Sequence, residues 1–332
     1  MRIFLAGDHY SGTGPANVTK YYMENLPDGT LWQKRRSKAA RAFEIVLNTL
    51  KSDVIVYSGY SKQNILGMRL AKRLGKPCAY IMHGCVEYEN AINQVPDEEM
   101  NRVERQTLEL ADLILAVSSG FAAFLKEYYP PYAKKIDHVT NGIDDTLSPG
   151  RASKRNADRH MIFTIGGGMP RKQIRYICAA IEKLRREYDK DLYLCVAGDK
   201  GADTEVIDSY GFVKDLGIVP FEETKALFGR AALFVQNSSF ETFGLAPVEA
   251  VSSGCPLLCS DKAGALEWLS GIKSEDVIEH FDDPDEIASK IRYNLENPNA
   301  ERLYEGIDRE KSSWKTAAES LTKKLSELVL KK

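Results

Sequence analysis

Short apolar runs alternate with amphipathic helical patterns along nearly the whole chain of 332 residues. Buried parallel strands read as continuous apolar runs, whereas half-exposed antiparallel strands alternate apolar and polar residues. The continuous runs therefore predict an α/β fold built from βαβ units and parallel sheets. The predicted strands are residues 2–7, 53–59, 78–84, 112–118 and 135–142, followed by 161–167, 192–198, 232–238, 256–261 and 276–281.

A polar break divides this alternation into two series. Residues 148–156, SPGRASKRN, have loop composition and no hydrophobic periodicity, which predicts a domain boundary. The length also favours two domains, because a single core rarely exceeds about 250–300 residues. We therefore predict Rossmann-like domains over 1–147 and 157–311. Residues 312–332 repeat apolar side chains at helical spacing, which predicts a final helix.

Composition excludes several classes of protein. The net charge of -2 argues against bulk nucleic-acid binding, and no apolar run approaches the roughly 20 residues of a membrane span. The N-terminus enters a strand pattern at once, without the apolar core of a signal peptide. Cys78, Cys178, Cys195 and Cys259 lie in or beside apolar runs, so we expect them to be buried reduced thiols and the protein to be cytoplasmic. Cys255 and Cys259 have no partner cluster of histidines or cysteines nearby, so we expect no metal site.

Charge is uneven in the first half of the chain. Residues 1–76 hold 13 Lys and Arg against 5 Asp and Glu, and the excess peaks in Lys34–Arg41, KRRSKAAR. This run is either a solvated helix face or a surface for an anionic lipid or an anionic acceptor.

Two glycine-rich loops follow predicted strands. Gly7–Pro15, GDHYSGTGP, leads into a helical pattern, and glycines let a backbone approach an anion at a helix N-terminus. The loop is not a full GxGxxG, so a nicotinamide dinucleotide site is disfavoured against a tight turn. Residues 166–172, GGGMPRK, place two cations at a strand end, which suits a phosphate better than an incidental exposed loop. The spacing of a Walker A loop is absent.

The segment SFETFGLAPVEA, residues 239–250, carries Glu241 in a loop and Glu249 in a predicted helix. The carboxylates of glycosidases lie about 5–9.5 Å apart across one bond. Eight helical steps rise by about 12 Å, so these two glutamates are spaced for different parts of one elongated ligand. This spacing disfavours a glycoside hydrolase.

The same segment, followed by SSGCPLL, resembles the E-x7-E signature of the retaining GT-B glycosyltransferases of family 4. Further matches occur in the expected order over about residues 1–270: SGTGPANV, GKPCAYIMHG, ADLILAVSSGF, HVTNGID, GGGMPRK, VAGDKG and VKDLGIVPFEET. The resemblance implies two Rossmann-like domains whose parallel sheets face across a cleft. It also implies that the final helix packs back on the first, acceptor-binding domain.

The resemblance implies roles for the matching positions. Glu249 would bind the ribose of a sugar nucleotide and Glu241 the donor sugar. Lys172 would neutralise the diphosphate, and His83 would face the sugar from the first domain. With Lys172, Glu241 and His83 as the catalytic group, the implied donor-binding positions are Gly12, Gly14, Arg171, Phe243, Gly244, Leu245 and Glu249. The family usually has an arginine where this chain has Gly167, and Arg171 is the candidate replacement.

The activity that the resemblance implies is retaining, metal-independent transfer of a sugar from a UDP- or GDP-linked donor. The acceptor would be a hydroxyl of a glycan, a lipid-linked molecule or another compound. We expect a cytoplasmic protein with peripheral contact to the inner face of the membrane through Lys34–Arg41. A sugar-nucleotide epimerase and a non-catalytic accessory subunit stay open as alternatives, and Gly167 favours the accessory subunit.

Overall fold

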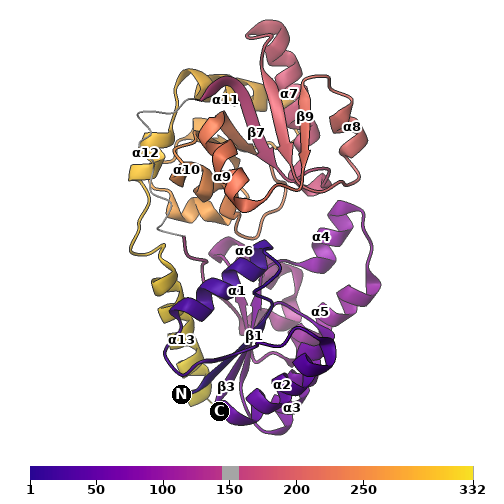
Figure 1. Cartoon of the computed structure of the whole chain (residues 1–332), viewed down its shortest axis with the longest axis vertical. Coiled ribbons are helices and arrows are strands. Elements are labelled where there is room, and N and C mark those ends of the chain that lie inside the picture. The colour runs from indigo at the N-terminus through magenta and orange to yellow at the C-terminus, as the bar shows by residue number, and fades with distance from the viewer. Residues whose placement is uncertain (144–156, 332) are drawn as a thin grey trace. The chain divides into compact units, whose positions relative to one another are not determined.

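The computed structural model describes residues 1–143 and 157–331, and these residues form two compact units (Figure 1). The first unit runs to Tyr88, resumes at Pro96 up to the undescribed stretch, and includes the chain from Glu310 onward. The second unit contains Glu89–Val95 and the described residues up to Arg309. The boundary predicted over 148–156 lies outside the described residues.

The first unit is built on a sheet with the strand order β2-β1-β3-β4-β5-β6, in which every pair is parallel. The strands are β1 (Ile3–Gly7), β2 (Leu31–Trp32), β3 (Val54–Ser58), β4 (Cys78–Met82), β5 (Leu113–Ala116) and β6 (Ile136–His138). The helices that join them are α1 (Gly14–Asn25), α2 (Lys38–Lys51), α3 (Lys62–Arg73), α4 (Val86–Asn93), α5 (Glu98–Leu110) and α6 (Ser119–Tyr128).

The second unit repeats this plan with the strand order β12-β11-β10-β7-β8-β9, again with parallel pairs. Its strands are β7 (Asp158–Ile165), β8 (Tyr193–Ala197), β9 (Val213–Gly217), β10 (Ala231–Gln236), β11 (Leu257–Ser260) and β12 (Val277–Ile278). Its helices are α7 (Ile174–Glu187), α8 (Thr204–Asp208), α9 (Phe221–Arg230), α10 (Leu245–Ser252), α11 (Pro284–Glu296) and α12 (Ala300–Glu305).

The central strands are buried on both faces. Every residue of β1, β3 and β4 is buried, as are those of β11 in the second unit. Helices cover such sheets because both apolar faces must leave water. The prediction of two parallel sheets from continuous apolar runs is therefore confirmed.

The last helix, α13 (Trp314–Leu330), belongs to the first unit, where it lies beside α1 (Figure 1). The Trp314 ring stacks on Tyr21 with centroids 4.8 Å apart and meets Tyr22 edge-on at 5.5 Å. The backbone N–H of Ile143 donates to the Ser312 carbonyl at 2.6 Å. These contacts bring the end of the described chain against the first helix of the same unit.

Candidate functional site

A buried ion pair lies at the carboxyl ends of two neighbouring strands of the second unit. Lys172 ends a short 3₁₀ turn, η3 (Pro170–Lys172), after β7, and Glu241 lies between β10 and α10. Because β7 and β10 are adjacent and parallel, the segments that follow them meet at one sheet edge. Lys172 Nζ lies 2.5 Å from Glu241 Oε2, and the two side chains are only 12% and 9% exposed.

Other polar groups also lie close to Glu241 Oε2, the oxygen that contacts Lys172. Arg171 Nη1 lies 3.7 Å from Glu241 Oε2 and donates to the Phe240 carbonyl at 3.4 Å. Gln236 Nε2 and Ser238 Oγ donate to that oxygen at 3.2 and 3.5 Å. Gln236 and Ser238 were not among the predicted site residues, although both stand at the end of a predicted strand, where polar side chains meet ligands.

The charges of this cluster are coupled. Burial raises the pKa of Glu241, but the cations of Lys172 and Arg171 outweigh it and hold that pKa below its usual value. Burial lowers the pKa of Lys172, and the Glu241 charge opposes that shift. Glu89, which groups with the second unit, lies 3.5 Å from Arg171 Nε. Glu241 is therefore ionised at neutral pH, with two cations directed at one of its oxygens.

The N-terminus of α10 begins beside Glu241. Its N-cap, Gly244, has φ +79°, and no side chain caps the helix or places an acid in its first turn. Phe243 is buried and Leu245 is the first helical residue, so the backbone N–H groups predicted to meet a phosphate stand at this start. Glu249 lies inside α10, on the C-terminal side of the segment.

The backbone conformation at position 167 requires a glycine. Its φ is +54°, and a Cβ atom at this position would lie 2.0 Å from the Asp199 carbonyl oxygen. The N–H groups of Gly167 and Gly168 donate to Ala197 and Asp199 at 3.0 and 2.9 Å, which pins the loop against the end of β8. The loop therefore has no room for an arginine at position 167, and the nearby positive charge comes from Arg171.

In the first unit, His83 follows β4 and joins a chain of hydroxyl groups. His83 Nε2 lies 2.8 Å from Ser58 Oγ, which lies 2.7 Å from Thr19 Oγ1. Thr19 in turn donates to the Pro15 carbonyl at 2.9 Å. Burial lowers the pKa of His83 to about 4, so the imidazole is neutral at neutral pH. Ser58 and Thr19 were not predicted as neighbours of His83, because these contacts depend on how β3, β4 and α1 pack together.

The two glycines predicted to approach the diphosphate, in the loop after β1, have free space around them. Gly12 has φ +72° and Gly14 begins α1, and no atom beyond their chain neighbours lies within 4 Å of a Cβ placed on either. A ligand can therefore approach the backbone here, as the sequence predicts for this loop.

Two family models cover these features. The model described as Glycosyltransferase Family 4 matches residues 4–147, and the model described as Glycosyl transferases group 1 matches residues 150–310. The chain belongs to glycosyltransferase family 4.

Relatives of this family 4 chain include enzymes named for different substrates. A D-inositol 3-phosphate glycosyltransferase from Pseudarthrobacter chlorophenolicus is 27% identical over 63% of this chain and 55% of its own length. An O-antigen chain mannosyltransferase B from Escherichia coli is 30% identical over 64% of this chain and 58% of its own length. The family 4 chain thus spans little more than half the length of these relatives.

Solved structures give the fold of the family 4 chain. A crystal structure of the Anabaena protein Alr3699/HepE in complex with UDP has a TM-score of 0.72 and 17% identity. The match covers 98% of this chain and 100% of that one. The α/β fold with GT-B architecture is therefore confirmed.

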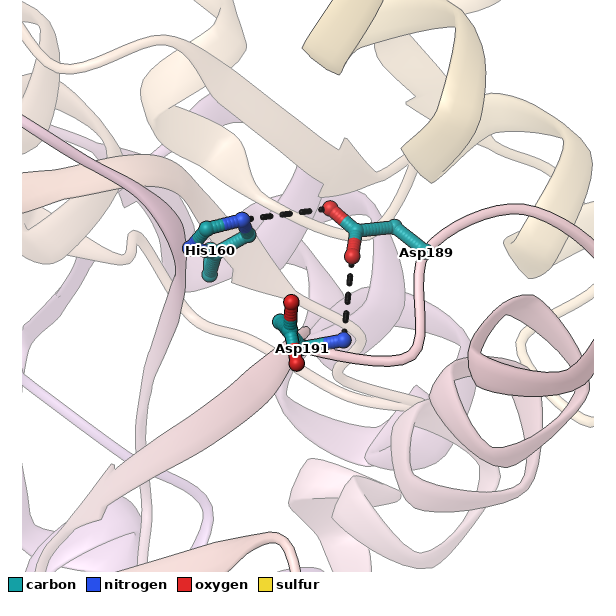
Figure 2. Close-up of side chains that lie close together, drawn as sticks. All are labelled: His160, Asp189 and Asp191. Atoms are coloured by element: carbon teal, nitrogen blue, oxygen red, sulfur yellow. Dashed lines mark hydrogen bonds and ion pairs between the residues drawn. The ribbon is translucent and has the colours of Figure 1, made fainter.

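A separate cluster of His160, Asp189 and Asp191 lies in the second unit of the family 4 chain, and Figure 2 shows these side chains gathered together. His160 Nε2 accepts from Arg159 Nε at 3.0 Å, and Asp189 Oδ1 accepts from the Asp191 N–H at 2.9 Å. Asp158, at the start of β7, lies 3.7 Å from the other imidazole nitrogen. The cluster is accounted for by these contacts and stands at the opposite ends of β7 and β8 from Lys172.

No helix among residues 1–143 and 157–331 is both long and apolar enough to cross a membrane. The six cysteines are buried, including Cys78, Cys178, Cys195 and Cys259, for which the apolar surroundings in the sequence predict it.

Proposed function

We propose that this protein is a retaining, metal-independent glycosyltransferase that moves a sugar from a nucleoside-diphosphate sugar to an acceptor hydroxyl. The observation that carries the proposal is the convergence of Lys172 and Arg171 on buried Glu241, beside the uncapped start of α10. Positive groups fixed in a partly buried place are what a departing diphosphate requires.

Lys172 has N–H donors that its contact with Glu241 does not use. An ammonium carries three N–H donors, and Glu241 Oε2 occupies one of them. We propose that the others meet the diphosphate, while the free N–H groups at the start of α10 meet the same anion. The carboxylate holds the lysine in place before the donor arrives, so little reorganisation accompanies the reaction. In this role the protein's own cations replace a metal ion.

Glu241 and Glu249 would bind two other parts of the donor, one each. Glu241 would contact the sugar and Glu249 the ribose hydroxyls, with the backbone of Phe243, Gly244 and Leu245 between them. We propose that neutral His83 contacts the sugar as a polar group of the first unit, and that Gly12 and Gly14 let their loop approach the diphosphate. The openness of those glycines supports the last point.

The donor is proposed to be UDP- or GDP-linked. The Anabaena structure contains UDP, and another structure of that protein contains UDP-glucose. The names of the relatives include an inositol phosphate and an O-antigen chain, so they favour no single acceptor. A glycan, lipid-linked or other hydroxyl acceptor stays the proposal.

The accessory-subunit alternative rested on Gly167. The positive φ and the close approach of Asp199 give that glycine a structural reason within its loop. Since Arg171 is directed at the same carboxylate as Lys172, the positive charge near the proposed phosphate site is retained. These two observations favour the transferase over the accessory subunit.

We also propose a cytoplasmic protein that touches an anionic membrane through α2 and the loop before it. The α2 side chains Phe43, Leu47 and Leu50 are 66%, 37% and 52% exposed and follow helical spacing. The basic run Lys34–Arg41 leads into this apolar stripe. Apolar side chains flanked by cations are typical of helices that lie on anionic lipid surfaces.

A thermal-shift screen with UDP, GDP, ADP and their sugars tests the donor, because a ligand that binds only the folded state raises the melting temperature. We expect one nucleotide family to raise it and the others to leave it unchanged. Donor consumption without any acceptor would instead identify an epimerase, and nucleotide binding without turnover against any acceptor would identify an accessory subunit.

A further inference from the structure

The first unit contains a small cavity at the ends of β1 and β2 whose lining includes none of the residues assigned to the donor. Its volume is about 250 Å³, and its lining combines the loop after β1 with Gln33, Arg35, Arg36 and Arg41. Ligand pockets for drug-sized molecules usually exceed about 300 Å³. This cavity, which we call the arginine pocket, therefore suits a compact ligand.

The guanidinium groups of the arginine pocket lack carboxylate partners. No salt bridge joins Arg35, Arg36 or Arg41 to a carboxylate in the part of the chain that the structure describes. Asp8 also lines the pocket, and its Oδ1 accepts the Tyr10 N–H at 2.9 Å. Burial lowers the pKa of Arg41, and the Asp8 charge opposes that shift. The three cations outnumber this one carboxylate, and a bound anion would reduce their mutual repulsion.

The loop that presents two of these arginines is held in place. Glu44 on α2 accepts the backbone N–H groups of Lys34 and Arg35 at 3.0 and 2.8 Å. Tyr10 donates to the Lys34 carbonyl at 3.0 Å, and the Arg36 guanidinium stacks over the Tyr10 ring at 4.1 Å. Glu44 Oε2 therefore binds the backbone of the loop, and the Glu44 carboxylate forms no salt bridge with Arg35, Arg36 or Arg41 in the described part of the chain.

Two buried polar atoms at the arginine pocket have no partner. Gln33 is 3% exposed, and its Oε1 accepts no hydrogen bond among the described residues. Arg41 Nε is buried and makes none either. Both atoms have almost no accessible surface, so a ligand that draws these side chains toward the cavity and supplies the missing partners is favoured. Arg41 Nε–H needs a hydrogen-bond acceptor, and Gln33 Oε1 needs a hydrogen-bond donor.

We propose that the arginine pocket binds a phosphate ester that also carries a hydroxyl group, and that this ester belongs to the acceptor substrate. The arginines take the phosphate oxygens, for which the planar guanidinium has matching paired donors. Gln33 Oε1 accepts from the neighbouring hydroxyl. That the ester is the acceptor rests on the proposed transferase function, whereas its binding does not.

Calorimetry on the full chain tests the binding, with glycerol 3-phosphate as the probe and inorganic phosphate for comparison. Arg41→Gln should weaken binding of glycerol 3-phosphate at least tenfold, and so should the exposed pair Arg35→Gln/Arg36→Gln. Arg69→Gln is the matched control, because Arg69 is exposed on α3 and outside the pocket. Gln33→Met should remove the preference for glycerol 3-phosphate over inorganic phosphate.

Vesicles distinguish a lipid headgroup from a soluble ester. Phosphatidylglycerol offers a hydroxyl-bearing phosphate ester, and phosphatidylserine offers similar charge without that hydroxyl. Arginine-dependent preference for phosphatidylglycerol over phosphatidylserine supports a lipid source. Arginine-dependent binding of glycerol 3-phosphate alone supports a soluble source.

The proposal is overturned if neither probe binds, or if the pocket variants and Arg69→Gln lose binding equally. UDP binding, measured on the same samples, separates this failure from failure of the transferase. UDP binding without phosphate-ester binding would refute only the ligand proposed for the arginine pocket. Phosphate-ester binding without any nucleotide binding would refute only the proposed transferase function.

Discussion

Lys172 Nζ lies 2.5 Å from Glu241 Oε2, although the two residues are 69 positions apart in the sequence. Both side chains are nearly buried, so each charge depends on the other for compensation. Breaking such a pair leaves an uncompensated buried charge, which typically costs about 3–5 kcal/mol.

Lys172→Ala should therefore abolish sugar transfer and also lower the free energy of unfolding of the second unit by about 3–5 kcal/mol. Lys172→Ala/Glu241→Ala should be equally inactive but less destabilised than Lys172→Ala, because in the single variant the buried Glu241 carboxylate keeps only the more distant Arg171 as a cationic partner. Urea unfolding of the wild type, both single variants and the double variant measures this coupling. Strictly additive losses would show that the two charges do not stabilise each other.

Gly167→Arg, which restores the residue usual in the family, should impair this protein. The Cβ would lie 2.0 Å from the Asp199 carbonyl oxygen in a backbone with φ +54°, so the end of β8 would have to move. We expect a fall in melting temperature and weaker nucleotide binding. Gly211→Ala is the control, since a Cβ there meets open space without a positive φ. A stable Gly167→Arg protein with improved nucleotide binding would contradict this account of the loop.

Most of the fold follows from apolar patterning, and the exceptions have a common cause. The strands β2 and β9 were not predicted, and both are edge strands of their sheets. Of the five residues of β9, Lys214, Asp215 and Leu216 are exposed, so this strand lacks the continuous apolar run of a central strand. An edge strand is paired on one side only, and a sequence pattern that detects burial overlooks it.

The candidate site was predictable as residue types but not as contacts. The family resemblance pointed to Lys172 and Glu241 separately, while their pairing depends on the order in which β7 and β10 join the sheet. The run Lys34–Arg41 predicts either a solvated helix face or a surface for an anionic lipid or acceptor, whereas α2 begins only at Lys38. Arg35 and Arg36 therefore lie in a loop, and their convergence with Arg41 on a cavity depends on the tertiary structure.

His83 should make the stability of the first unit depend on pH. Burial lowers the pKa of His83 to about 4 from 6.5, so the unfolded chain binds a proton more readily than the folded one. Stability should therefore fall as the pH drops from about 6.5 towards 4, by about 3 kcal/mol at the lower end.

His83→Gln removes this titration. The variant should be less stable than the wild type at pH 8, where it loses the contact with Ser58, and the difference should shrink as the pH falls. Chemical unfolding at several pH values follows it. A stability difference that is constant between pH 8 and 4.5 would show that His83 is not held in its neutral form by burial.

Glu249→Ala should act mainly on donor binding. Glu249 lies inside α10, whereas Glu241 lies in the loop before it. The ribose contact proposed for Glu249 is therefore separate from the contacts proposed at the bond that breaks. We expect the KM for the donor to rise about tenfold or more, as for loss of hydrogen bonds to a charged group, with a smaller change in kcat. Glu223→Ala, on exposed α9 surface, is the control. A kcat that falls while KM is unchanged would assign Glu249 to the chemical step.

The central claim is that Lys172 and Glu241 serve sugar transfer from a nucleoside diphosphate. The most direct measurement uses a sugar-labelled donor whose nucleotide binds in the thermal-shift screen, and follows label entering the acceptor and nucleoside diphosphate release together. The account predicts equal amounts of both with the wild type. It predicts losses of at least a hundredfold with Lys172→Ala and with Glu241→Ala, as for loss of groups that stabilise transition-state charge. Wild-type rates in both variants would contradict it.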